Sequence, residues 1–190
     1  KINLPKDKFT RPLKDLAKES IFNIIQHSNI FKFNLEKSKV LDLFSGVGSF
    51  GLECISRGAQ KVIFCENYTP AIKILNKNIL DFDCKKKTEI ITENIFNIKN
   101  LEQFYNKKFD LIFLDPPYKE ERLSSLLNDI FSLKLLNNKG IIIIHRQNKE
   151  KEDYPKKLNI LKIKTYGISK IIFGNLFFSK IFFVSLFINS

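Results

Sequence analysis

The chain has 190 residues, of which 44% are hydrophobic and 27% charged, and it carries a formal net charge of +12. This length and apolar content predict a single globular domain and exclude an intrinsically disordered chain. The positive charge favours a polyanionic partner such as nucleic acid, because basic surfaces attract phosphate backbones. A lysine- and isoleucine-rich composition of the kind that an AT-rich genome produces would give the same charge without any such function.

Long apolar segments and metal-binding clusters are both lacking in the sequence. The most apolar stretch, residues 176–188, is shorter than the roughly 20 residues that span a bilayer and contains Lys180. We therefore expect no membrane segment and assign this stretch no function. Three separated cysteines and two distant histidines argue against a disulfide framework and a metal site, and free thiols favour the cytoplasm. No signal peptide is recognisable, and because the sequence contains no Met we expect further residues to precede Lys1.

Hydrophobic periodicity predicts a helix over residues 15–27, followed by strands and helices in alternation. The strands are expected at residues 40–44, 61–65, 89–92, 109–114 and 140–145, and the helices between them at residues 48–57, 69–80 and 120–133. Short runs of Ile, Leu and Val separated by helical patterns indicate βαβ units. They therefore predict a parallel sheet with helices on both faces.

The end of the chain has a different pattern. Residues 158–165 and 169–173 have the character of strands, and only a short turn around Tyr166-Gly167 divides them. Two strands without an intervening helix indicate an antiparallel hairpin. The chain therefore predicts an α/β fold with a mostly parallel seven-stranded sheet that ends in this hairpin. We treat residues 1–190 as one domain, with an N-terminal extension and helix over residues 1–37 and a core over residues 38–190.

The first strand of the predicted sheet is followed by a glycine-rich turn. Gly46, Gly48 and Gly51 form a G-x-G-x-x-G pattern, in which the first two let the backbone approach a ligand and the third lets a helix pack closely on a strand. The same pattern is the dinucleotide fingerprint, with Glu66 at the distance of a ribose-binding acid, so a nicotinamide dehydrogenase stays open here. Asp42 favours another ligand, because a carboxylate at the strand end would repel a pyrophosphate. It would hold, directly or through water, the ammonium group of S-adenosylmethionine, which carries no phosphate.

Residues at the ends of the next strands complete this expected cofactor site. Glu66, at the tip of the second strand, would accept hydrogen bonds from two ribose hydroxyls. Asn94, after the third strand, would contact the adenine, although a turn residue that caps the following helix is an equally good interpretation. Phe44 and Asn67 adjoin these positions and belong to the same expected site.

The fourth strand ends abruptly in Asp115-Pro116-Pro117-Tyr118, which is the predicted catalytic tetrapeptide. The prolines hold the chain extended and cannot donate backbone hydrogen bonds, while their carbonyls remain free to accept them. Asp115 and the Pro116 carbonyl would accept the two hydrogens of an exocyclic amine on a nucleobase, and Tyr118 would stack on the base. Holding this weak nucleophile in line for displacement is most of the catalysis, and the base must be unstacked to reach the pocket. The alternative is a proline-rich turn that merely ends a strand.

Three segments, in order along the chain, resemble motifs of the bacterial 16S rRNA (guanine(966)-N2)-methyltransferases. Residues 11–23 resemble the motif R-P-x-x-D-x-x-[RK]-E-[TS]-[LI]-F-N. Residues 41–53 resemble L-D-x-F-[AS]-G-[ST]-G-x-[LF]-G-[LI]-E, and residues 109–118 resemble F-D-[LI]-[IV]-F-x-D-P-P-[YF]. One departure is Val47, where the family usually has Ser or Thr.

The resemblance implies a class I methyltransferase fold, which is Rossmann-like, and S-adenosylmethionine as the methyl donor. It also implies methylation of the exocyclic N2 amine of a guanine in 16S rRNA, within the small ribosomal subunit or its assembly intermediate. Arg11, Lys14 and Lys18 would then contact the RNA backbone or help to close over the cofactor, and a solvated helix face is the alternative for them. We further expect a cytoplasmic monomer that uses no metal.

Three other function classes predict different features in the sequence. A DNA adenine-N6 methyltransferase shares the D-P-P-Y motif, but such enzymes usually carry an inserted recognition region, and the chain after Tyr118 has room for one helix before the fifth strand. A non-catalytic RNA-binding module on the same fold would be expected to have lost Asp115 or the acids of the loop. A nicotinamide dehydrogenase needs a catalytic His or a Tyr-x-x-x-Lys pair. Neither His27 nor His145 has an obvious catalytic setting in the sequence.

Overall fold

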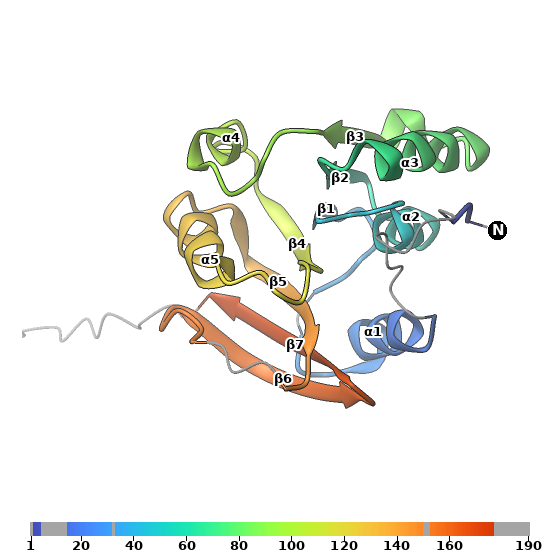
Figure 1. Ribbon diagram of the computed structural model, residues 1–190. Coiled ribbons are helices and arrows are strands. Elements are labelled where there is room, and N and C mark those ends of the chain that lie inside the picture. The colour runs from blue at the N-terminus through green and yellow to red at the C-terminus, as the bar shows by residue number, and fades with distance from the viewer. Residues whose placement is uncertain (1, 5–14, 32, 150–152, 177–190) are drawn as a thin grey trace, which may run out of the picture.

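The computed structural model describes residues 2–4, 15–31, 33–149 and 153–176. Within these residues, seven strands form one sheet in the order β3-β2-β1-β4-β5-β7-β6 (Figure 1). They are β1 (Lys39–Leu43), β2 (Lys61–Cys65), β3 (Thr88–Ile91), β4 (Phe109–Leu114), β5 (Leu136–Gln147), β6 (Leu158–Tyr166) and β7 (Ser169–Leu176). Strands β1 to β5 run parallel, whereas β7 runs antiparallel to both β5 and β6. The predicted mostly parallel sheet and its C-terminal hairpin are confirmed.

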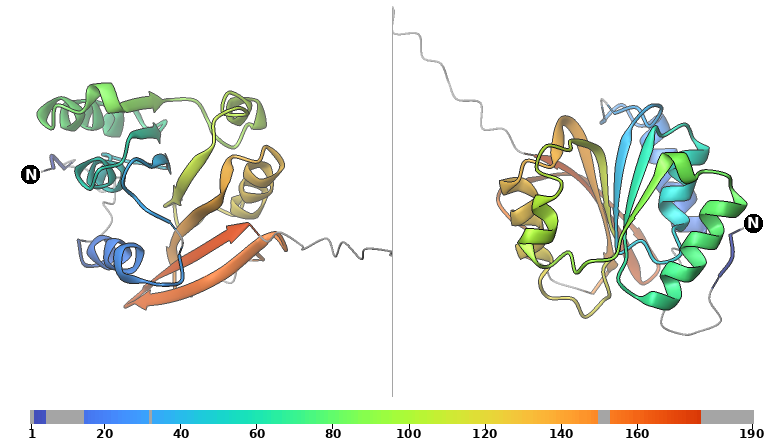
Figure 2. Two further views of the ribbon diagram at one scale, coloured as in Figure 1. Left: turned by 180° about the vertical axis from the view of Figure 1, so that it is seen from behind. Right: turned by 90° about the horizontal axis from the view of Figure 1, so that it is seen from above.

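Helices cover both faces of the sheet (Figure 2). On one face lie α1 (Asp15–His27), α2 (Ser49–Ser56) and α3 (Thr69–Asp81), and on the other lie α4 (Ile98–Glu102) and α5 (Leu123–Ser132). A short 3-10 helix, η1 (Lys85–Lys87), precedes β3. None of the helices in the described part of the chain has the length and apolar character needed to cross a membrane. Beyond residue 176, the apolar stretch singled out in the sequence lies outside the described residues.

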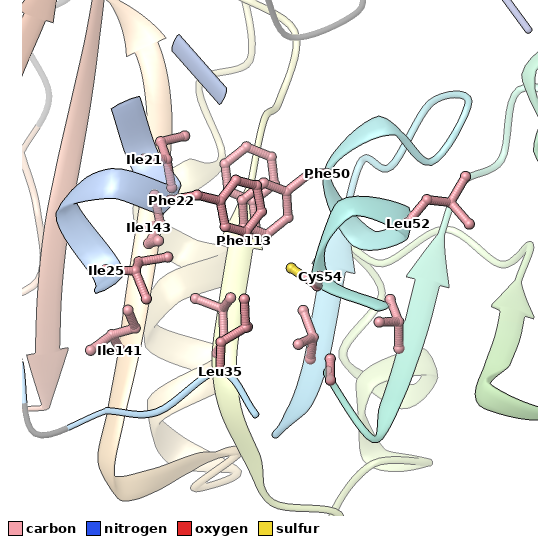
Figure 3. Packing of buried hydrophobic residues seen from close by; sticks show 14 of the residues in the cluster. Ile21, Phe22, Ile25, Leu35, Phe50, Leu52, Cys54, Phe113, Ile141 and Ile143 are labelled. Atoms are coloured by element: carbon pink, nitrogen blue, oxygen red, sulfur yellow. The ribbon is translucent and has the colours of Figure 1, made fainter. Parts of the chain in front are cut away.

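Helix α1 packs on the centre of the sheet through a stack of three buried aromatic rings (Figure 3). The ring of Phe22 in α1 lies 5.2 Å from that of Phe50 in α2, and the ring of Phe50 lies 3.8 Å from that of Phe113 in β4. Burying a Phe side chain contributes roughly 1.5–3 kcal/mol, and stacked pairs add to this. The stack therefore holds the N-terminal helix beside the loop that joins β1 to α2.

Several elements differ from their predicted bounds. Strand β5 is the largest difference, because it begins at Leu136 rather than at residue 140 and pairs with the start of β4 before an irregularity in their register. Helix α4 is absent from the sequence-based prediction, since five residues are too few for a helical period to be recognised. Helix α5 begins at Leu123 rather than at residue 120. The Glu120 carboxylate accepts a hydrogen bond from the backbone N–H of Arg122 and holds a turn there.

The carboxyl ends of β1 and β4 bring the two sequence motifs together. These strands are neighbours at the centre of the sheet, where Asp42 pairs with Phe113 and Leu43 pairs with Leu114. The chain continues from β1 toward β2 on one side of this point, whereas β5 follows β4 on the other side. Ligands of open parallel sheets bind where the strand order reverses in this way. The candidate site therefore lies in the loops that follow β1 and β4.

Candidate active site

The loop after β1 turns sharply before α2 begins. Phe44, Gly46 and Gly48 have φ angles of 63°, 54° and 83°, all in the left-handed region. At Gly48, the N-cap of α2, an added Cβ would lie 2.4 Å from Cδ1 of Leu75 in α3, so only glycine fits this position. Phe44 adopts the left-handed region despite its side chain, and such strained positions cluster in ligand-binding loops.

Asp42 ties this loop to the start of α2. Its Oδ2 accepts a hydrogen bond from the backbone N–H of Gly51 at 3.0 Å, and its side chain is buried. A Cβ on Gly51 would lie 2.3 Å from a ring carbon of Phe64 in β2, which confirms that this glycine lets α2 pack closely on the sheet. Two buried atoms, Oδ1 of Asp42 at the end of β1 and Oγ of Ser45 in the loop, have no hydrogen-bond partner among the described residues. Such atoms fit donors that a bound ligand or its water molecules would supply.

The electrostatic environment of the loop is acidic. Burial raises the pKa of Asp42 well above its usual value, the hydrogen bond from Gly51 lowers it, and the nearby carboxylates of Asp115 and Glu66 raise it further. Acids that converge in this way attract a cation. Among the described residues there is no group of three or more His, Cys, Asp or Glu side chains placed to hold a metal ion. The converging carboxylates of Asp42, Glu66 and Asp115 suit a positively charged ligand.

Glu66 lies directly after β2 and faces the same loop. One carboxylate oxygen, Oε2, accepts a hydrogen bond from the backbone N–H of Gly46 at 2.7 Å. The other, Oε1, accepts one from the backbone N–H of Tyr68 at 2.8 Å. Each carboxylate oxygen has a second lone pair, so Glu66 retains the capacity to accept hydrogen bonds from hydroxyl groups. The two backbone bonds fix its orientation.

A pocket of about 190 Å³ opens beside Glu66. It is lined by Phe44, Cys65, Glu66, Asn67, Glu93, Asn94, Ile95, Phe96, Pro117, Glu120 and Arg122. Four predicted cofactor residues and one residue of the tetrapeptide are therefore brought together. Gly46 and Gly48 lie in the adjoining loop, and Asp42 lies in β1 just before it.

Phe96 and Arg122 in this lining were not singled out in the sequence. The guanidinium carbon of Arg122 lies 3.8 Å from the centre of the Phe96 ring, and the ring of Phe44 lies 5.5 Å from it. Phe96 therefore offers the pocket an aromatic surface that is held from two sides. A Phe two residues after Asn94 was the available signal, but an aromatic residue in a loop is too common to point to a site.

Asn94 has the turn role that the sequence left open. Its Oδ1 accepts a hydrogen bond from the backbone N–H of Phe96 at 3.0 Å. The side chain of Asn97, not that of Asn94, caps helix α4. Asn94 nevertheless lines the pocket, so the turn presents it to a ligand there.

The predicted catalytic tetrapeptide leaves the end of β4 beside the end of β1. The backbone N–H of Asp115 donates to the carbonyl of Leu43 at 3.4 Å, which joins the two loops. The expectation that both proline carbonyls are free is wrong for Pro117. Its carbonyl accepts a hydrogen bond from the buried guanidinium of Arg146 at 2.8 Å, and the half-buried Tyr118 accepts one through its carbonyl at 3.2 Å.

The surroundings of Asp115 correct a second expectation. His145, at the end of β5, lies with its Nδ1 2.8 Å from Oδ1 of Asp115, so this histidine has a setting within the site after all. Thirty positions separate the two residues in sequence. They meet because β4 and β5 are parallel neighbours in which Leu114 pairs with Ile144.

Of the three predicted RNA-contacting residues, Lys18 is described, and Arg11 and Lys14 lie outside the described residues. The Lys18 ammonium lies 3.3 Å from Oγ of Ser49 at the start of α2 and 3.3 Å from Oδ1 of Asp15. Its side chain is 16% exposed. Lys18 therefore lies beside the start of α2, directly after the glycine loop, and its contact with RNA or with the cofactor loop stays a prediction.

Comparison with known proteins identifies the family. The model of the family described as conserved hypothetical protein 95 matches residues 1–175. The chain belongs to this family. It is 31% identical over 163 residues to the putative rRNA methyltransferase YlbH of Bacillus subtilis, with 85% of each protein covered. It is 30% identical over 160 residues to ribosomal RNA small subunit methyltransferase D of Haemophilus influenzae, with 83% of this chain and 79% of that protein covered.

Solved structures confirm the class I methyltransferase fold. The structure of a putative methylase from Haemophilus influenzae is matched with a TM-score of 0.67 and 27% identity, over 85% of this chain and 98% of that one. A putative methyltransferase from Escherichia coli is matched with a TM-score of 0.73 over 91% of this chain and 89% of that one. Its identity of 19% means that this second comparison shows the fold alone.

Proposed function

We propose that this protein transfers a methyl group from S-adenosylmethionine to the exocyclic N2 amine of a guanine in 16S rRNA of the small ribosomal subunit. The observation that supports it best is the position of the Asp115-Pro116-Pro117-Tyr118 tetrapeptide at the pocket that Glu66 and Asn94 line. A nucleobase held by the tetrapeptide would lie next to a methyl donor held by the pocket.

The residues of the pocket and loop fit S-adenosylmethionine, which supplies an electrophilic methyl group on a sulfonium when it is bound. The loop acids suit its two positive charges, and Oδ1 of Asp42 is a buried acceptor for its ammonium group or for a water molecule between them. Glu66 would accept from the ribose hydroxyls. Asn94 and the ring of Phe96 would contact the adenine.

The tetrapeptide orients the acceptor amine. Asp115 accepts one hydrogen of the amine through Oδ2, and the Pro116 carbonyl accepts the other, so that the nitrogen lone pair points toward the methyl group. The amine is a weak nucleophile because its lone pair is delocalised into the base, so orientation supplies most of the rate enhancement. Tyr118 stacks on the base, an interaction typically worth about 1–3 kcal/mol. After transfer, the extra proton passes from the nitrogen to water.

The choice of RNA over DNA rests on the relatives and on the short connection after the tetrapeptide. The relatives in Bacillus subtilis and Haemophilus influenzae are named rRNA methyltransferases. Between β4 and β5 the structure has α5 and no inserted recognition domain. Recognition would then come from the shape of the RNA within an assembled particle or its precursor. This substrate, together with three buried free cysteines, favours activity in the cytoplasm.

The test is transfer of labelled methyl groups to small ribosomal subunits, naked 16S rRNA and duplex DNA, followed by identification of the modified nucleoside. We expect N2-methylguanosine in the particle. N6-methyladenosine as the sole product would overturn the guanine assignment, and labelling of DNA alone would make the protein a DNA methyltransferase.

Asp115→Ala should abolish transfer while S-adenosylmethionine binding stays nearly unchanged. Asp42→Ala should weaken that binding instead, and undiminished affinity would contradict its assigned role.

A further inference from the structure

The end of strand β5 lies against the catalytic tetrapeptide and has no role in the function proposed so far. His145 and Asp115 stand side by side where β5 and β4 end, one pair beyond Leu114 and Ile144. The His145 Nδ1 lies 2.8 Å from Oδ1 of Asp115. The His145 side chain is 9% exposed and the Asp115 side chain 21%. The histidine thus forms the buried wall, and the aspartate reaches the open side of the site.

The hydrogen bond to His145 gives the two oxygens of the Asp115 carboxylate different surroundings. Oδ1 is directed inward and shares a hydrogen bond with the imidazole of His145. Among the described residues, no other hydrogen bond to this carboxylate is found. Oδ2 is then the oxygen available to an acceptor amine. The terminal torsion of an aspartate is broad and roughly two-fold, so without an inner partner the carboxylate would rotate between orientations. One fixed oxygen removes that freedom.

We propose that His145 is a positioning residue for methyl transfer, which fixes the Asp115 carboxylate so that its outer oxygen meets the substrate amine. The inference rests on the proposed function and adds a residue to its site. Because an ionised carboxylate only accepts hydrogen bonds, Nδ1 of His145 carries the proton in this pair. His145 does not touch the substrate and takes no part in the covalent step.

The size of the effect follows from the demands of positioning. Misplacing a reacting group by about 1 Å can slow a reaction by about 10²-fold, even when the altered residue lies outside the chemistry. His145 should therefore affect the rate of the methyl-transfer step much more than the binding of the cofactor, since it is not part of the pocket lining. A purely structural histidine would instead affect folding stability and leave the rate of folded enzyme unchanged.

The experiment compares three substitutions in single-turnover transfer to small ribosomal subunits. His145→Asn places an amide N–H near the position of Nδ1 and should retain a rate within about fivefold of wild type. His145→Gln carries the same amide one methylene further out, beyond that position, and His145→Leu has no donor. Both should be slower by about ten- to a hundredfold, with the affinity for S-adenosylhomocysteine unchanged. His27→Leu, which removes the other histidine at the exposed end of α1, is the matched control and should behave as wild type.

Two results would overturn the inference. The first is a His145→Leu rate within about twofold of wild type, and the second is equal loss in the Asn and Gln variants. If His145→Leu fails to fold, the comparison of Asn with Gln still decides, because both side chains carry the same amide and differ in its distance from the backbone. If the wild-type protein transfers no methyl group to RNA, the proposed function is wrong. If the wild type is active and the His145 variants have the same rate, only the role of His145 is wrong.

A measurement without substrate tests the pair directly. Nitrogen NMR of the imidazole should show the proton on Nδ1 of His145 in the wild-type protein, because the carboxylate selects that tautomer. Asp115→Ala should change this tautomer preference, and an identical spectrum in the two proteins would contradict the hydrogen bond on which the inference depends.

Discussion

Arg146 and Pro117 are joined by a 2.8 Å hydrogen bond in which a fully buried guanidinium donates to the carbonyl of the second proline in the tetrapeptide. The same guanidinium also donates to the carbonyls of Tyr118 at 3.2 Å and Glu120 at 3.1 Å. The Arg146 side chain on β5 thus binds three backbone carbonyls of the loop after β4, which carries the predicted acceptor site. The loop gains its shape from this bonding as well as from its prolines.

Replacing Arg146 should therefore destabilise the protein and loosen the loop. Arg146→Ala removes hydrogen bonds to three backbone carbonyls, of which that of Pro117 keeps another donor, the backbone N–H of Glu120. We expect a loss of about 3 kcal/mol or more in the free energy of unfolding. Arg146→Lys should recover little of it, because one ammonium group cannot match the planar fork of a guanidinium. Urea denaturation measures both losses. Arg57→Lys is the control, since Arg57 forms a partly exposed pair with Glu53 and should change stability by less than about 0.5 kcal/mol.

Gly51 gives a second prediction, about packing. Gly51→Ala would place a methyl group 2.3 Å from the Phe64 ring and 2.7 Å from a methyl group of Val62, so α2 must move away from β2. We expect a loss of about 1–3 kcal/mol by thermal or urea unfolding, although alanine favours helices intrinsically. The comparison is Gly167→Ala in the β6–β7 turn, where nothing lies within 4 Å and only the φ of 55° is unfavourable. An equal loss in both variants would contradict the packing argument.

The elements best predicted from the sequence are those whose signal is local. The bounds of β2 and β4 agree to the residue, because each is a short apolar run between polar or turn-forming residues. Helix α1 likewise has an apolar period long enough to read. The short helix α4 and the first residues of β5 depend on tertiary contacts, and the sequence carries no comparable signal for them.

The candidate site divides in the same way. Glu66 and Asp115 each follow a strand directly, and Asn94 comes three residues after the end of β3, so the rule that strand ends meet at one edge was enough to find them. The roles of His145 and Arg146 depend on β5 lying beside β4 in a particular register, which motif spacing does not contain. His145 and Arg146 directly follow Ile144, a buried core residue of the same strand. Nothing in the sequence of the strand therefore marks these two residues as part of a site.

Phe96 supports a third prediction, about the cofactor pocket. If its ring contacts the adenine, Phe96→Ala should raise the Kd of S-adenosylhomocysteine by about tenfold or more, since stacking of a base on an aromatic side chain is worth about 1–3 kcal/mol. Isothermal titration calorimetry measures the change. Tyr105→Ala removes an aromatic ring that is 62% exposed and not part of the pocket lining, and should leave the Kd unchanged. If the wild type, Phe96→Ala and Tyr105→Ala bind S-adenosylhomocysteine with the same Kd, Phe96 does not contact the adenine.

Asp42 leads to a prediction about stability and pH. Its pKa is raised in the folded protein above its usual value of 3.8, chiefly because burial disfavours the charged carboxylate. The folded state therefore binds the proton more tightly than the unfolded state does. As the pH rises from about 3.8 toward the higher pKa of the folded state, ionisation favours the unfolded chain, and this contribution of Asp42 to stability is lost.

Asp42→Asn removes the charge and keeps an oxygen that can accept the hydrogen bond from Gly51. The difference in melting temperature between this variant and the wild type should be small at about pH 4 and should shift in favour of the variant by about pH 8. Asp83→Asn, at an exposed carboxylate, is the matched control and should show no such trend. A difference that stays constant with pH would mean that Asp42 ionises as easily in the folded protein as in the unfolded chain. If the trend appears and the variant also binds S-adenosylmethionine more weakly, the buried charge that costs stability is the one that the cofactor uses.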